Sequence, residues 1–251
     1  MRNSKLFILL SILFILGCSG INNSREFTKD SLDQISQINL ELASRYFQGN
    51  EFVLAEEKLN KSIKANPKNV QSQNLMGVIY SKQGKLKDAE TFFNRALKLD
   101  NNHIYTLNNY GQFLCQMKRY EKGEGYLYKA LRSNNPTMQA TVYYNIAKCR
   151  IDQDKRESAE IYFKKVLEIS PSHSATLIEL TQIKFHKERW KEASEYLKKF
   201  NQIADHNSQS LWLGYLIGLK TYDQNLSDTS ALILKKKFPA SKEANLLKNN
   251  Y

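Results

Sequence analysis

VQSQNLMGVIYSKQGKLKDAETFFNRALKLDNNH, residues 70–103, holds two apolar segments on either side of Gly84. In both segments the apolar residues recur every three or four positions, which is the spacing of an amphipathic helix. Small residues at Gly77 and Ala89 let two such helices approach closely, and Phe93 is large enough to fill space toward a neighbouring unit. The stretch therefore predicts a pair of antiparallel helices.

The pattern of this stretch recurs along the chain at spacings of 34 to 36 residues. A recurrence of this length indicates stacked units that share one continuous core, because a single unit cannot bury its apolar face alone. The small and large landmark positions that we expect to form the repeat core are Gly77, Tyr80, Ala89, Phe93, Gly111, Ala159, Phe163 and Ala193.

These landmarks resemble those of the tetratricopeptide repeat, a helix–turn–helix unit. The resemblance implies an all-α fold, a right-handed superhelical solenoid of about six repeats. The predicted units are residues 36–69, 70–103, 104–139, 140–173, 174–207 and 208–241. In the sixth unit Gly214 and Gly218 depart from the register. We predict that residues 18–35 are a lipidated N-terminus and tether, and that residues 242–251 are a C-terminal tail.

The first residues read as a processing signal. Two basic residues precede LFILLSILFIL at residues 6–16, an apolar run that is too short to span a bilayer. Residues 15–18, Ile-Leu-Gly-Cys, resemble the lipobox of bacterial lipoproteins. We predict a lipoprotein signal peptide over residues 1–17 and lipidation of Cys18, whose acyl chains would anchor the protein to a membrane. By resemblance to lipoproteins of two-membrane bacteria, Ser19 directly after Cys18 implies the periplasmic face of the outer membrane. The alternative to lipidation is an ordinary secretory signal followed by a chance cysteine.

The chain is basic, with a formal net charge of +12. Its lysines occur mostly as pairs on predicted helix faces, without the basic stripe and stacking aromatics that indicate a nucleic-acid partner. We interpret the charge as a solvated face, or as an attraction to an acidic partner or anionic lipid. The four histidines stand apart, and no nucleophile or phosphate-loop motif is present. We therefore predict no enzyme activity, metal, cofactor, nucleic acid or small-molecule substrate.

In stacked repeats of this kind the first helices line a concave groove. The residues that we predict to face it are Asn74, Tyr105, Asn108, Asn109, Gln112, Tyr144, Asn145 and Lys148. Carboxamides both donate and accept hydrogen bonds, so they suit a peptide backbone. This composition predicts a polypeptide partner in the groove. The alternative is that asparagine is common throughout the chain and carries no meaning here.

Cys115 and Cys149 lie on the predicted first helices of neighbouring units. A disulfide is permitted outside the cytoplasm. It requires Cα atoms within about 7 Å, which is closer than the usual separation of about 8–10 Å between helix axes. The residues themselves leave two states open, a bridge or two buried thiols that pack as small apolar groups.

Residues 108–115, NNYGQFLC, resemble the signature of the PilF/PilW family of type IV pilus biogenesis lipoproteins. The likeness extends from the lipobox through the repeats to KFPASKEA at residues 237–244. The resemblance implies an outer-membrane lipoprotein that helps the secretin pore to reach that membrane and assemble, or that stabilises the pilus. Similar members carry a cysteine in each of the third and fourth units, which favours a bridge between Cys115 and Cys149.

Two other functions stay open. One is a helical-repeat lipoprotein of the outer-membrane barrel-insertion machinery, and the other is an adaptor for a cell-wall enzyme. The sequence favours a lipid-anchored, non-catalytic scaffold whose partner is a secretin or another pilus assembly protein.

Overall fold

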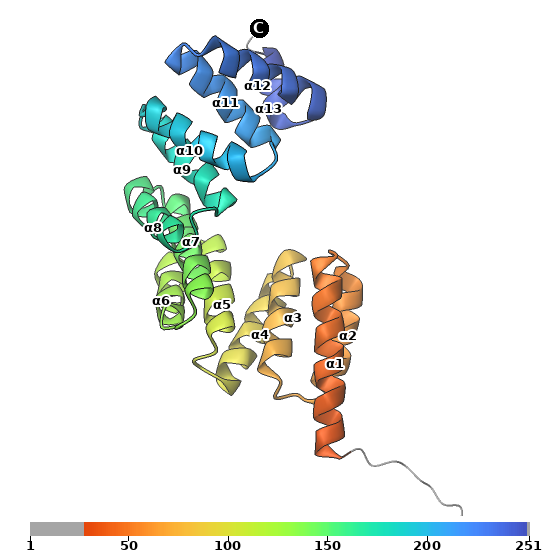
Figure 1. Cartoon of the computed structure of the whole chain (residues 1–251). Helices are drawn as coiled ribbons and strands as arrows, with labels where there is room; N and C mark the ends of the chain where they lie inside the picture. Colours follow the sequence, from red (N-terminus) through yellow and green to blue (C-terminus); the bar gives the residue numbers. More distant parts are fainter. Residues whose placement is uncertain (1–27, 250–251) are drawn as a thin grey trace, which may run out of the picture.

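The computed structural model describes residues 28–249, which form a curved stack of helix pairs (Figure 1). Thirteen helices and no strand occur in this part of the chain. The first helices of the units are α1 (Lys29–Gln48), α3 (Val70–Lys82), α5 (Ile104–Gln116), α7 (Pro136–Asp152), α9 (Ser174–His186) and α11 (Ser208–Thr221). The second helices are α2 (Phe52–Ala65), α4 (Leu86–Leu99), α6 (Tyr120–Ala130), α8 (Arg156–Ile169), α10 (Trp190–Ile203) and α12 (Gln224–Lys237), and α13 (Lys242–Asn249) follows them. The predicted all-α repeat solenoid is confirmed.

Local signals explain where the first helices begin. The side chain of Asn69 accepts a hydrogen bond from the backbone N–H three residues later, which caps α3. A ring nitrogen of His103 caps α5 in the same way, and His173 caps α9. Burial lowers the pKa of both histidines, and this keeps the accepting nitrogen unprotonated. Two of the four isolated histidines therefore act as helix caps.

The turn inside each unit repeats with the sequence. One residue in each of the six turns has a left-handed backbone. These residues are Asn50, Gly84, Lys118, Asp154, Glu188 and Tyr222. Their spacing equals the repeat period, so the turn geometry is the same even where the residue is not glycine.

The landmark residues pack as their sizes predict. A Cβ atom on Gly77 would lie 2.8 Å from the Phe93 ring, so only glycine lets α3 approach α4 this closely. The buried Phe93 ring stacks on that of Tyr110 in the next unit, with ring centroids 5.4 Å apart. Ala89, Gly111, Ala159, Phe163 and Ala193 are also buried. The core therefore runs from unit to unit instead of being confined within each pair.

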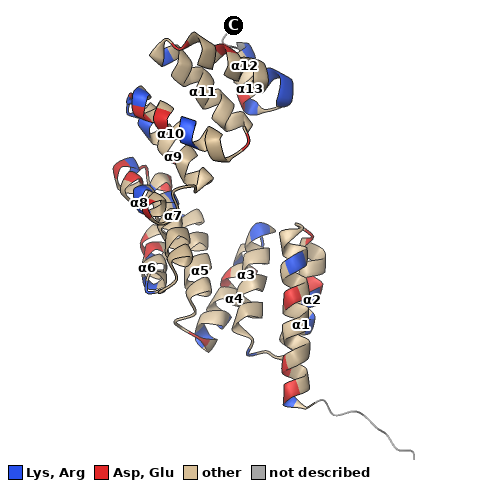
Figure 2. Ribbon diagram, in the orientation of Figure 1, with Lys and Arg blue, Asp and Glu red and all other residues tan. Residues whose placement is uncertain are grey.

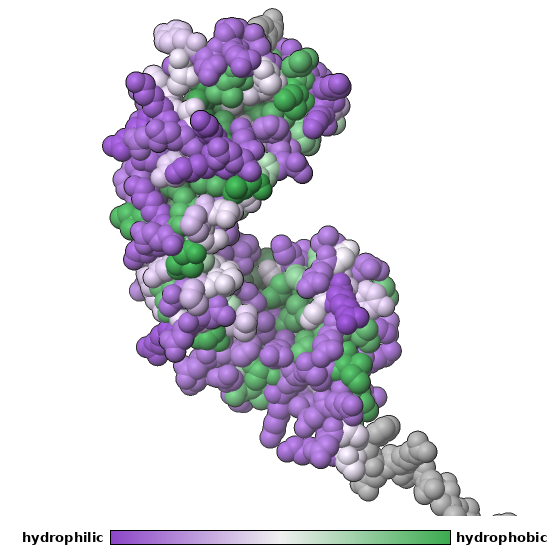
Figure 3. Space-filling model, viewed as in Figure 1, coloured by the Kyte–Doolittle hydropathy of each residue, from purple (hydrophilic) through white to green (hydrophobic). Residues whose placement is uncertain are grey.

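The stack curves toward its first helices. Neighbouring first helices pack directly on each other in the pairs α1–α3, α3–α5, α5–α7 and α9–α11. Each second helix instead packs on the first helix that follows it. This closer approach on one side places the first helices on the inner side of the curve, which is hollowed in the space-filling view (Figure 3).

Both ends differ from the prediction. Residues 29–35, predicted to be part of the tether, are the first turns of α1. The side chain of Asn66 donates to Asp33 at 2.7 Å, which holds these turns against the end of the first pair. Residues 242–249, predicted to be a tail, form α13. Ala244 and Leu247 are buried against α11 and α12, so α13 caps the stack.

The sixth unit is a full helix pair. A Cβ atom on Gly214 or Gly218 would collide with Ser230 or Ser227 of α12, so both glycines mark close contact between α11 and α12. Among the helices of residues 28–249, none combines the length and apolarity that crossing a bilayer requires. Charged residues of both signs are spread over the helices in the view of Figure 2.

Candidate functional site

A chain of asparagine side chains crosses the inner face of α3, α5 and α7. The Asn145 amide donates to the Asn108 carbonyl oxygen at 2.8 Å. Asn108 donates to Asn109 at 3.2 Å, and Asn109 donates to Asn74 at 3.2 Å. The first and last of these bonds join neighbouring units. The asparagines therefore link three successive units in one polar chain.

Three residues predicted to face the groove are buried instead. Asn74, Asn108 and Asn145 are only 8%, 5% and 6% exposed. The prediction that they are exposed was wrong. The repeat register indicates which face of a helix a residue lies on, but not how far neighbouring helices cover that residue. The neighbouring first helices approach closely enough to cover these positions. Removing one amide would leave its partner unpaired in the interior, so we expect these residues to stabilise the fold.

The other predicted groove residues are more accessible. Tyr105 is 56% exposed, and Gln112 is also exposed. Tyr144 is half-buried, with its ring against His173. Lys148 is half-buried and forms an ion pair with Glu179 at 2.7 Å. Tyr105 and Gln112 are thus the predicted residues that a partner could reach most easily.

Two adjoining hollows lie along the inner face of the first three units. The larger, about 380 Å³, is lined by residues of α1, α3 and α5 that include Leu40, Tyr105 and Asn109. The smaller, about 250 Å³, is lined by residues that include Val78, Gln112 and Asn109. Both are lined mainly by polar side chains, with a few apolar ones among them, and amides of this kind can pair with a peptide backbone. Asn109 borders both, so one extended segment could occupy them in series.

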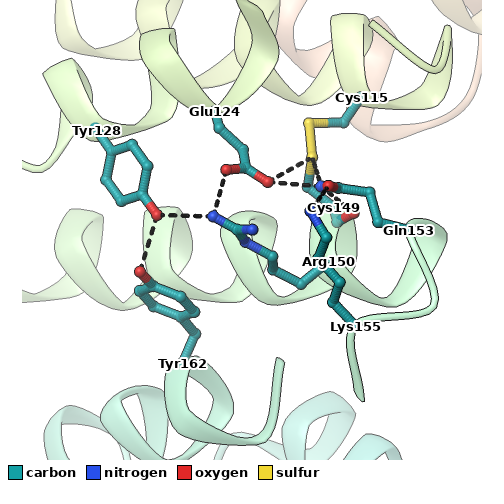
Figure 4. Close-up of polar contacts among 8 residues, drawn as sticks. All are labelled: Cys115, Glu124, Tyr128, Cys149, Arg150, Gln153, Lys155 and Tyr162. Carbon is teal, nitrogen blue, oxygen red and sulfur yellow. Dashed lines mark hydrogen bonds and ion pairs between the residues drawn. A yellow bond between two sulfur atoms is a disulfide. The ribbon is translucent and has the colours of Figure 1, made fainter. Parts of the chain in front are cut away.

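A disulfide joins the third and fourth units. It links Cys115 of α5 to Cys149 of α7, whose Cα atoms are 5.4 Å apart (Figure 4). Room for it comes from close packing within the third unit. A Cβ atom on Gly123 would lie 2.8 Å from both the Cys115 sulfur and the Gly111 carbonyl oxygen. Glycine therefore stands where other units have alanine, such as Ala89.

A buried carboxylate lies beside the bridge. Glu124 accepts hydrogen bonds from Arg150 at 2.5 Å and from Gln153 at 2.6 Å (Figure 4). Arg150 also donates to the Tyr128 hydroxyl at 3.3 Å, and the hydroxyls of Tyr128 and Tyr162 are 2.9 Å apart. These contacts pair the charge of Glu124 and extend the junction into the fourth unit.

The junction between the fourth and fifth units contains a buried ion cluster. Lys184 is 2% exposed and pairs with Glu160 at 3.0 Å and with Glu192 at 2.5 Å. Burial alone would raise the pKa of Glu160, but hydrogen bonds from Lys164, Lys184 and Lys187 lower it to about 2. The carboxylate is therefore ionised at any ordinary pH.

Sequence reasoning missed this cluster, although a signal for it exists. A glutamate directly follows the small landmark residue in four units, at Glu56, Glu90, Glu124 and Glu160. In each case it bonds to side chains of the next unit. An acid that recurs at this position, followed by a basic residue near the end of the next first helix, could have predicted the contacts.

Comparison with known proteins identifies the repeats. Residues 103–172 and 70–103 match the tetratricopeptide repeat family. The structure is similar to a solved structure of Pseudomonas aeruginosa PilF, with a TM-score of 0.77, 24% identity, and coverage of 88% of this chain and 99% of that one. It is also similar to crystalline PilW, described as a widely conserved type IV pilus biogenesis factor, with a TM-score of 0.77, 25% identity, and coverage of 85% and 98%. The chain is a tetratricopeptide-repeat protein with a PilF/PilW-like fold.

Other tetratricopeptide-repeat proteins share less of this arrangement. YrrB, described as having an unusual peptide-binding site, is 14% identical, with a TM-score of 0.55 and coverage of 76% of this chain and 97% of that one. No curated protein sequence matches the chain significantly.

The described part of this tetratricopeptide-repeat protein contains inner-face hollows and networks of paired side chains at the junctions between units. Within residues 28–249, no three His, Cys, Asp or Glu side chains are grouped to hold a metal ion. Cys18 and the predicted signal peptide lie outside the described residues.

Proposed function

We propose that this chain is a lipid-anchored, non-catalytic scaffold for type IV pilus biogenesis that binds a polypeptide partner along its inner face. The similarity to PilW carries the proposal, because it covers 85% of this chain and 98% of that one and so includes the repeat array as a whole. The NNYGQFLC stretch at residues 108–115 supports it independently.

The binding surface of this proposal is smaller than the sequence predicted. It consists of the two inner-face hollows, with Tyr105 and Gln112 as accessible contacts and Leu40 and Val78 as apolar ones. Asn109 can contribute at the border of the hollows, whereas Asn108 and Asn145 hold the units together. A partner lying here would cover apolar side chains and meet amides that pair with its backbone.

The anchor would act by raising local concentration. A lipid on Cys18 would keep the inner face close to the membrane, because only a short segment separates Cys18 from α1. Secretin subunits or other pilus assembly proteins held there would meet at a higher effective concentration. Changing Cys18 to serine should move the protein from the membrane fraction to the soluble periplasm. Unchanged fractionation of this variant would argue against the lipid.

The groove is tested by a photo-crosslinking residue placed at Tyr105 in cells that make pili. We expect crosslinks to a secretin or another pilus assembly protein. The matched control is Val53 on α2, which is 78% exposed and lies outside both hollows. Crosslinks to barrel-insertion proteins, or equal crosslinking from both positions, would contradict the proposal.

A further inference from the structure

A third hollow lies apart from the inner-face hollows, at the turns of the fifth and sixth units. Its volume is about 460 Å³. Trp190 and Lys191 line it from the start of α10, and Lys220 and Tyr222 line it from the end of α11. We call it the Trp190–Tyr222 hollow. No helix that lines the inner-face hollows contributes to it.

Tyr222 contributes little to the fold. It is 96% exposed, and it occupies the left-handed turn position of its unit, with φ of 60°. A bulky residue is rarely found in this backbone conformation. The equivalent turn positions hold Asn50, Gly84, Lys118 and other small or polar residues. An aromatic ring that packs on nothing, at a position that disfavours it, suggests selection for binding rather than stability.

The start of α10 supplies a second aromatic ring to the lining. Trp190 is half-buried, and the Lys220 ammonium lies 5.6 Å from the centroid of its ring. Tryptophan, tyrosine and arginine are the residues enriched where protein interfaces gain most of their affinity. This hollow contains Trp190, Tyr222 and Arg189 together.

The lining of the hollow carries a net positive charge, with three basic residues against two glutamates. Arg189, Lys191 and Lys220 line the hollow. Of its two carboxylates, Glu192 pairs with Lys184 at 2.5 Å and with Arg189 at 3.6 Å, whereas Glu188 forms no ion pair within the described part of the chain. Among the described residues, Lys191 has no carboxylate within ion-pair distance. Lysines that are not neutralised within the chain favour an acidic ligand.

We propose that the Trp190–Tyr222 hollow is a second docking site, which takes an acidic segment of a partner protein. An apolar side chain of that segment enters between the two rings, and flanking carboxylates face Lys191 and Lys220. The site goes beyond the proposed inner-face function, because it involves different units and does not depend on what the inner face binds.

Tryptophan fluorescence can report binding at this site, because Trp190 lines the hollow and the chain has one other tryptophan, Trp212. In the Trp212→Phe variant of the full chain, Trp190 is the only source of tryptophan fluorescence. The ligand probe is the blocked peptide Asp-Glu-Phe-Glu-Asp. We expect a saturable change in emission that weakens with added salt. Peptides with alanine in place of phenylalanine, or lysines in place of the acids, should bind at least about tenfold more weakly.

The deciding variant is Tyr222→Gly in the same background. Glycine suits the left-handed turn, so the melting temperature should stay the same or rise, while affinity for the acidic peptide falls about tenfold or more. The matched control is Lys118→Gly, which changes the same turn position in the third unit and should leave binding unchanged. An absence of saturable binding, equal binding of the basic peptide, or unchanged affinity in Tyr222→Gly would overturn the proposal. Crosslinking from Tyr105 tests the inner face separately.

Discussion

The junction between the third and fourth units and the junction between the fourth and fifth units have the same glutamate contact. They differ in what else holds the units together. In both, a buried glutamate after the small landmark bonds to the next first helix, Glu124 to Arg150 and Glu160 to Lys184. The third-to-fourth junction adds a disulfide, and α5 packs directly on α7. At the fourth-to-fifth junction, the described residues show no comparable packing of α7 on α9. This junction depends more on its charges.

This difference shows that units of the same repeat can be held to each other either by a covalent bond or by buried ion pairs. The two junctions should therefore respond to different conditions. A reductant should weaken the third-to-fourth junction, and acid should weaken the fourth-to-fifth.

The largest expected effect is at the ion cluster. Glu160→Gln leaves the buried Lys184 ammonium with Glu192 as its only carboxylate partner. Breaking a buried pair from one side typically lowers the free energy of unfolding by about 3–5 kcal/mol. Urea unfolding measures it. The control is Glu57→Gln, which removes exposed ion pairs with Lys58 and Lys61 and should change stability far less. Equal effects of the two variants would show that the cluster does not hold the junction.

Reduction of the Cys115–Cys149 bridge should cause the second-largest loss in the free energy of unfolding. The two cysteines are 34 residues apart, and a loop of this size corresponds to about 3–4 kcal/mol in the chain-entropy description. Unfolding with and without a reductant measures the effect. The Cys115→Ala, Cys149→Ala double variant should not respond to the reductant. If the reductant lowers the stability of this double variant as much as that of the natural chain, loss of the bridge is not the cause of the destabilisation.

Acid should act on the ion cluster. The folded pKa of Glu160, about 2, is below its ordinary value of 4.5, so protons bind more tightly to the unfolded chain. The resulting stabilisation is present above about pH 4.5 and is lost as pH falls toward 2, a difference of about 3 kcal/mol. The stability gap between the natural chain and Glu160→Gln should narrow over this window. A gap that is constant with pH would contradict the assigned pKa.

The smallest effect concerns the space beside the bridge. Gly123→Ala places a methyl group against the Cys115 sulfur and the Gly111 carbonyl, which should cost about 1–3 kcal/mol. Gly125→Ala is the control in the same helix, because a Cβ atom there meets nothing within 4 Å. It should raise stability by about 0.5–1 kcal/mol, as alanine favours helix over glycine. Thermal unfolding compares the two, and the same sign for both would contradict the packing argument.

Much of the fold could be predicted from local pattern. Gly77, Ala89 and Phe93 are spaced as a helix pair requires, and their recurrence predicted the stack. The ends were predicted less well, because α1 is extended by the contact of Asn66 with Asp33 and α13 is held by Leu247. Such contacts come from residues far apart in the sequence, which a repeat period does not reveal.

The sequence by itself determined the period, the helix pairs and the order of small and large landmark residues, because these depend on spacing along one chain. Only the tertiary structure decided that Asn108 and Asn145 are buried, that Cys115 meets Cys149, and that Lys184 is enclosed by carboxylates. Each of these depends on how closely one unit approaches the next. That distance is set by the packing of whole helix pairs and not by any single stretch of residues.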